Sequence, residues 1–130
     1  MSRIRVIHVI TRFDKGGSAE NTCLTALGLD PGSYELQLVV GASEESDMGP
    51  EERTCVEENL ARLRARGVKI LTLAELVRRV SPLNDLTALF RLWRLFRRER
   101  PRIVHTHTSK AGIVGRWAAW LAGVPVILHT

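Results

Sequence analysis

The chain has 130 residues, of which 45% are hydrophobic and 25% charged, so it reads as one globular domain rather than a disordered or fibrous chain. Its formal net charge is +5, and no apolar run approaches the roughly 18 residues of a membrane span. Residues 44–58 carry seven acids and one arginine, whereas residues 91–102 carry six arginines and one acid. The basic segment favours an anionic partner such as phosphate, nucleic acid or anionic lipid, unless it is simply a solvated helix face.

The first third of the chain predicts a strand, a helix and a second strand. Residues 3–10 form an apolar run that is too short for a signal sequence and is broken by His8, so we expect a buried strand there. A loop with two glycines follows, and then a helix over 18–28 that Ser18 can cap. A turn leads into the second strand over 34–41.

The rest of the chain continues the alternation of strands and helices. In chain order we expect an acidic loop over 42–50, a helix over 51–66, a strand over 68–73, an irregular segment over 74–82, a helix over 83–100, a strand over 102–107, a helix over 109–122 and a strand over 125–130. The helix over 83–100 is the clearest, because its large apolar residues share one face and most of its arginines lie opposite. Cys23 and Cys55 fall on separate expected helices without metal-binding spacing, which favours inert thiols in a reduced protein.

This order predicts an α/β fold with a Rossmann-like, doubly wound parallel sheet covered by helices on both faces. With strand order 3-2-1-4-5, the first and fourth strands are neighbours at the switch point of the sheet. Ligands of such sheets bind beyond the carboxyl ends of the strands. The loops over 11–21 and 105–112 should therefore face one crevice.

The loop after the first strand contains Gly16 and Gly17. Adjacent glycines allow a tight turn and a close approach to a ligand, and the helix start behind them favours an anion. The loop is neither G-x-G-x-x-G nor a P-loop, and no acid ends the second strand to hold a ribose. Dinucleotide and P-loop functions are thus disfavoured, while a plain strand-to-helix turn remains an alternative.

The segment RIVHTHTSKAG ends the fourth strand with polar side chains. Alternation places His105 and His107 on one face of the strand. An H-x-H pair can bind a metal, but no acid or cysteine nearby completes a set, so we expect no metal site. Either histidine could be a hydrogen-bonded core residue, and His107 is better placed to reach a ligand. Thr108, Ser109 and Lys110 are donors suited to hydroxyls and phosphate oxygens, hence to sugars or nucleotides.

Three stretches carry a family resemblance: VIHVITRFDKGGSAENT, LVRRVSPLNDLTAL and RPRIVHTHTSKAGIVGRWAAWLAGVPVILHT. Together they cover nearly half of the chain, and with them the chain resembles the N-terminal half of GT-B glycosyltransferases of family 4, above all the capsule and exopolysaccharide members. The resemblance implies two Rossmann-like domains with a cleft between them. The N-terminal domain mostly holds the acceptor and the C-terminal domain mostly holds the nucleotide sugar. Residues 1–130 would then be an incomplete N-terminal domain without the C-terminal one.

The resemblance also assigns roles by position. Gly16 and Gly17 look like the glycine loop that approaches the donor diphosphate and the acceptor. His107 looks like the family's catalytic histidine near the transferred sugar. The residues that look like acceptor or phosphate contacts are Arg12, Ser109, Lys110 and, with the least support, Arg78.

The activity implied by the resemblance is transfer of a sugar, with retention, from a nucleotide-diphosphate sugar to a hydroxyl of a lipid-linked or polysaccharide acceptor. It implies no cofactor and no nucleic-acid partner. The fragment alone is expected to be inactive, because the family's paired-glutamate motif and the basic residues that stabilise the leaving diphosphate belong to the other domain. The alternative is a natural subunit of a split glycosyltransferase that acts as a binding or anchoring module. A flavodoxin-like regulatory domain is disfavoured, because no Asp ends the third strand.

Two further expectations concern the surface. The implied location is cytoplasmic, with peripheral contact at the inner face of the plasma membrane through the arginine face of residues 83–100, where Trp93 and Phe96 could touch lipid. The competing interpretation is that these aromatic side chains belong to the core and the arginines are solvated. A chain that ends in a strand also exposes a sheet edge, which predicts homodimers or other self-association.

Overall fold

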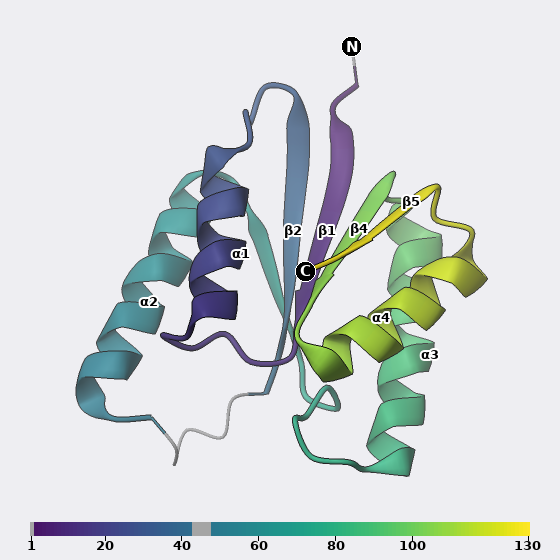
Figure 1. The fold of residues 1–130 in the computed structure, drawn as a ribbon. Coiled ribbons are helices and arrows are strands. Elements are labelled where there is room, and N and C mark those ends of the chain that lie inside the picture. The colour runs from purple at the N-terminus through teal and green to yellow at the C-terminus, as the bar shows by residue number, and fades with distance from the viewer. Residues whose placement is uncertain (1, 43–47) are drawn as a thin grey trace.

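A computed structural model describes residues 2–42 and 48–130 of the protein, and these form an α/β domain in which strands and helices alternate (Figure 1). The elements are β1 (Ile4–Ile10), α1 (Gly17–Gly28), β2 (Tyr34–Gly41), α2 (Pro50–Ala65), β3 (Lys69–Leu73), α3 (Pro82–Glu99), β4 (Ile103–His107), α4 (Ser109–Ala122) and β5 (Val126–His129). The predicted element order is therefore confirmed, and no boundary differs from the predicted one by more than one residue. Most of the acidic loop predicted for 42–50 lies outside the described residues. No described helix is long and apolar enough to cross a membrane.

The sheet is parallel throughout, with strand order β3-β2-β1-β4-β5. This confirms the predicted doubly wound topology. The chain starts in the middle of the sheet, builds outward through β2 and β3, and then returns to place β4 on the other side of β1. Helices α1 and α2 cover one face and α3 and α4 the other (Figure 1), as right-handed crossovers require.

Two apolar layers sandwich the sheet. Ile7 and Val9 of β1 point toward α3 and α4, whereas Val6 and Ile10 point toward α1 and α2. Burial on both faces explains why β1 reads as a nearly continuous apolar run. His8 lies in that run with its side chain buried, on the same face as Ile10.

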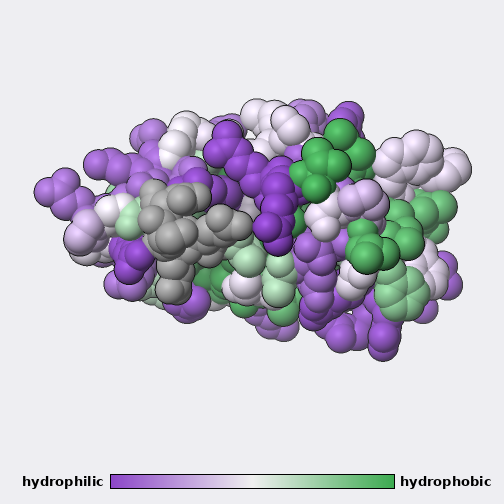
Figure 2. All heavy atoms as spheres, turned by 90° about the horizontal axis from the view of Figure 1, so that it is seen from below, coloured by the Kyte–Doolittle hydropathy of each residue, from purple (hydrophilic) through white to green (hydrophobic). Residues whose placement is uncertain are grey.

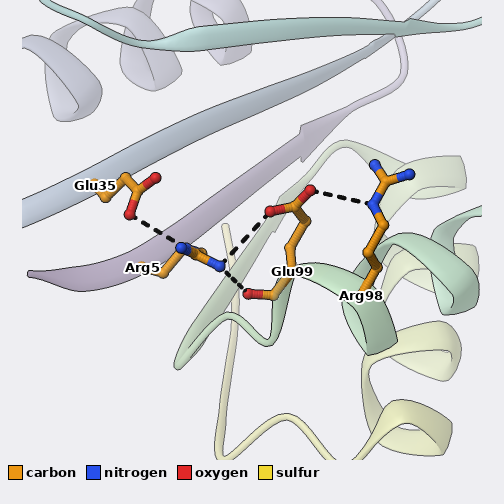
Figure 3. Close-up of polar contacts among 4 residues, drawn as sticks. All are labelled: Arg5, Glu35, Arg98 and Glu99. Atoms are coloured by element: carbon orange, nitrogen blue, oxygen red, sulfur yellow. Dashed lines mark hydrogen bonds and ion pairs between the residues drawn. The ribbon is translucent and has the colours of Figure 1, made fainter.

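An ion-pair network holds the amino-terminal end of the sheet, far from the carboxyl ends of the strands. Arg5 on β1 lies 3.3 Å from the carboxylate of Glu35 on β2 and 3.6 Å from that of Glu99, the last residue of α3 (Figure 3). Arg5 also donates a hydrogen bond to the backbone carbonyl of Glu99, and Arg98 pairs with the same carboxylate. These half-exposed pairs each contribute up to about 1 kcal/mol and tie the end of α3 to β1.

Candidate functional site

A pocket of about 500 Å³ opens at the carboxyl ends of β1 and β4. Its lining comes from the loops after these two strands and from the segment before α3, and consists of Thr11, Arg12, Asp14, Gly16, Gly17, Ser18, Arg78, Thr108, Ser109 and Lys110. Figure 2 views this end of the molecule and shows hydrophilic side chains near its middle, with hydrophobic side chains gathered on the side of α3 and α4. The lining includes every residue to which the family resemblance gives a role except His107.

The loop after β1 delivers the start of α1 to the pocket. Gly16, rather than Ser18, is the N-cap residue, and no side chain caps the helix. Asp14 instead accepts a hydrogen bond from the Gly16 backbone N–H at 2.7 Å, which forms a tight turn just before the helix begins. Uncapped N–H groups of the first turn favour an anionic ligand.

Gly17 is a glycine that the fold does not require. It is not among the described residues with positive φ, and no heavy atom lies within 4 Å of the position that a Cβ would occupy. Because Gly17 has no side chain, the space beside this first residue of α1 stays open at the mouth of the pocket.

The loop after β4 carries backbone strain next to the pocket. Thr108, the N-cap residue of α4, has φ 70°, a region that side chains with a Cβ rarely adopt and that costs of order 1–3 kcal/mol. Its hydroxyl donates to the Thr11 hydroxyl at 3.0 Å, and the Thr11 hydroxyl accepts from the Ala111 backbone N–H at 2.9 Å. This pair of threonines joins the two loops and fixes the pocket floor. Thr11 belongs to the loop predicted to face the crevice, but nothing in the sequence besides its position at the end of β1 indicated this role.

Lys110 lines the pocket, but its ammonium group already has protein partners. It lies 2.6 Å from the Asp85 carboxylate and donates to the Arg79 backbone carbonyl at 2.8 Å, with its side chain only 13% exposed. Lys110 thus clamps the start of α3, and the segment before it, onto α4. Arg12 and Arg78 are the lining arginines of the pocket.

His107 does not reach the pocket. The residue is 1% exposed, and its Nε2 lies 3.1 Å from Nδ1 of His8, so it is a hydrogen-bonded core histidine. His107 is absent from the pocket lining, because it lies on the sheet face that α1 and α2 cover, whereas the pocket opens beyond the strand end. Burial, and to a smaller extent the neighbouring imidazoles, lower the pKa of His107 to about 4 and that of His8 to about 3. Both rings are neutral at pH 7.

Known proteins resemble the chain in sequence and in structure. Residues 16–130 match the family described as glycosyl transferase 4-like domain. Over 63 residues the chain is 46% identical to the UDP-Gal:alpha-D-GlcNAc-diphosphoundecaprenol alpha-1,3-galactosyltransferase of Escherichia coli, and over 53 residues 36% identical to the capsular polysaccharide biosynthesis glycosyltransferase CapM of Staphylococcus aureus. These matches cover 48% and 41% of the chain but only 16% and 14% of the two relatives.

The structure of MurG from Acinetobacter baumannii superposes with a TM-score of 0.65 at 17% identity, over 97% of this chain and 35% of that one. At this identity the likeness concerns the fold alone. The chain thus spans about a third of that structure.

Proposed function

The chain belongs to the glycosyl transferase 4-like family and has the fold of the N-terminal half of a GT-B enzyme, and from this we propose that it is the acceptor-binding domain of a retaining glycosyltransferase. The proposed reaction moves a sugar from a nucleotide-diphosphate sugar to a hydroxyl of a lipid-linked or polysaccharide acceptor. The observation that carries the proposal is the pocket in which two helix starts and two arginines converge. The name of the E. coli relative includes a UDP-sugar donor and a diphosphoundecaprenol acceptor, which supports the same substrate classes.

The pocket chemistry suits a glycosyl acceptor that carries a diphosphate. The first turns of α1 and α4 point positive dipole ends at the pocket, and Arg12 and Arg78 add full charges for phosphate oxygens. The Ser109 hydroxyl can donate a hydrogen bond to a sugar hydroxyl or accept one, and the Thr108 hydroxyl, whose proton goes to Thr11, can still accept one. Because these groups are held in place before any ligand binds, they position the acceptor without reorganisation.

His107 has a different part in this proposal from the catalytic one expected by resemblance. Since it is buried and bonded to His8, we assign it a positioning role: it anchors the strand end from which Thr108 and Ser109 project.

The donor sugar, in this proposal, binds mainly to a second domain that faces the pocket, carried either by the same chain or by a partner subunit. The described residues include one sheet only. Residues 1–130 by themselves are therefore expected to bind acceptor but not to transfer a sugar.

Gly17→Val in the intact protein tests the proposed site. The new side chain meets no protein atom near its Cβ position, so the thermal midpoint should stay near that of the wild type, while it projects into the mouth of the pocket. We expect kcat/KM for a polyprenyl-diphosphate sugar acceptor to fall at least about tenfold, which corresponds to roughly 1.4 kcal/mol of lost transition-state binding.

Gly28→Val, at the other end of α1, is the matched control, because it also meets no neighbouring atom. It should leave kcat/KM unchanged. A folded Gly17→Val protein with full transferase activity would contradict the assignment of the pocket.

We also propose peripheral membrane contact, at a surface other than the one expected from the sequence. Phe96 is 1% exposed and belongs to the core, and Trp93 packs against that core with the Arg97 guanidinium 6.0 Å from its ring centroid. Large apolar side chains are exposed in and just before the first half of α3 and on α4. Among them are Val80, Leu83, Leu86, Phe90, Ile113 and Trp117.

Vesicle sedimentation tests this surface in the intact protein. Leu83→Glu combined with Leu86→Glu should lower binding to phosphatidylglycerol vesicles at least about tenfold, because two exposed leucines lose their burial in the bilayer interface. Leu24→Glu, a control on the exposed side of α1, should leave vesicle binding unchanged. Equal binding by the wild type, the double variant and Leu24→Glu would refute the membrane contact.

We also propose self-association through the outer edge of β5, because that edge pairs with no described strand. Light scattering without vesicles tests this separately.

A further inference from the structure

Three of the four histidines of the chain meet on one face of the sheet, beneath the start of the pocket. We propose that His8, His105 and His107 bind a divalent ion of the zinc class. One ligand nitrogen from each ring lies within 4.8 Å of the others. The H-x-H pair of β4 lacked a third ligand in the sequence, and the fold supplies it from β1, nearly 100 residues earlier.

Strand geometry makes the cluster rigid. His8 is the direct partner of His105 in the β1–β4 register, and His107 lies two residues further along β4, so all three side chains share a face. The ring centroids are 4.2 Å apart for His105 and His107, 5.1 Å for His8 and His105, and 5.4 Å for His8 and His107. A pair of histidines on one strand with a third on its neighbour presents three nitrogens without any loop having to close.

The nitrogen spacing suits a tetrahedral ion. His8 Nδ1 and His107 Nε2 are 3.1 Å apart. Two nitrogens bound at about 2.0–2.1 Å to one tetrahedral zinc ion are roughly 3.3–3.4 Å apart. An ion can therefore replace the proton that these two nitrogens share with a shift of a few tenths of an ångström.

A polar contact beside the cluster points the same way. His105 Nε2 lies 2.6 Å from the Thr130 hydroxyl, a contact of the kind that orients metal-bound imidazoles.

The three imidazole ligands also determine which ions fit the site, and they leave one coordination position open. Three neutral imidazoles favour zinc, cobalt, nickel or copper over magnesium and calcium, which prefer oxygen ligands. Three protein ligands leave a fourth position for water, as in open zinc sites. His8 and His107 are buried and His105 is half-buried, so the ion enters from the side of His105.

Metal titration of the intact, chelator-treated protein tests the inference. Cobalt should give one tetrahedral visible-absorption spectrum per chain, and zinc should compete for the same site in calorimetry and raise the thermal midpoint. His105→Gln changes the accessible ligand and should lower zinc affinity at least about 100-fold, more than the loss of a mere orienting partner. His105→Cys should retain binding and add a thiolate charge-transfer band with cobalt.

His129→Gln is the matched control. His129 is bonded to Thr106, which lies on the opposite face of β4, and it should leave binding unchanged. The inference is overturned if the folded protein gives no cobalt spectrum and no zinc-dependent stabilisation, if binding survives His105→Gln, or if His129→Gln removes it. None of these readouts uses transferase activity, so an inactive enzyme that still binds cobalt refutes the proposed function alone.

Discussion

Gly41→Ala should largely abolish the native fold. Gly41 ends β2 at a point where a Cβ atom would lie 2.0 Å from the Thr11 carbonyl oxygen and 2.1 Å from that of Leu76. Both obstacles are backbone atoms in buried segments, and they flank the methyl group from two sides, so neither a rotamer change nor a small side-chain movement relieves the contact.

The loops after β1 and β3 must separate to admit even this methyl group. We expect a loss of at least about 4 kcal/mol in the free energy of unfolding, out of the roughly 5–15 kcal/mol of a typical domain. Urea denaturation followed by circular dichroism measures this. Because Thr11 also shapes the pocket floor, any folded Gly41→Ala protein should in addition have a distorted pocket.

Gly28→Ala is the control for glycine removal as such. It lies in the last turn of α1 with open space around it, and alanine there should be neutral or slightly stabilising. A Gly41→Ala protein whose unfolding free energy stays within about 1 kcal/mol of the wild type would show that the close approach of the three strand ends is wrong.

Arg12→Ala should have the largest effect on transferase activity. The guanidinium lines the pocket, its Nε is buried with no hydrogen-bond partner among the described residues, and it lies 3.5 Å from the Asp14 carboxylate. Asp14 therefore holds the group in place while leaving hydrogen-bonding capacity for a phosphate. We expect kcat/KM to fall about 100-fold or more, in the range seen when one preorganised charge-stabilising donor is removed.

The charge alone should not restore the activity lost with Arg12. Arg12→Lys should recover only part of it, because an ammonium group cannot make the two parallel hydrogen bonds of a guanidinium to phosphate. Arg64→Ala, an exposed arginine on α2, is the control and should have full activity. If Arg12→Ala keeps wild-type kcat/KM at unchanged stability, the pocket is not where phosphate binds.

Much of the architecture follows from local signals in the sequence. Short apolar runs, turn residues such as Asp30-Pro31-Gly32 and the stop at Pro101 predicted each element and the order of the sheet. These signals suffice because strand and helix periods are properties of neighbouring residues. Topology then follows from the handedness of crossovers. Five of the lining residues predicted from motif and resemblance, Gly16, Gly17, Arg12, Ser109 and Lys110, lie where the loops after β1 and β4 meet.

Only the tertiary structure decided what these side chains touch. The register of β1 against β4 buries His107 against His8, and no local pattern reveals that partner 99 residues away. The same holds for Lys110. From the sequence its charge was predicted to bind a ligand, but in the structure it pairs with Asp85 of α3. Periodicity says which face a residue occupies, whereas the partner on that face depends on how non-adjacent strands and helices pack. The alternation of elements was therefore readable from the chain, while the histidine cluster and the clamp at Lys110 were not.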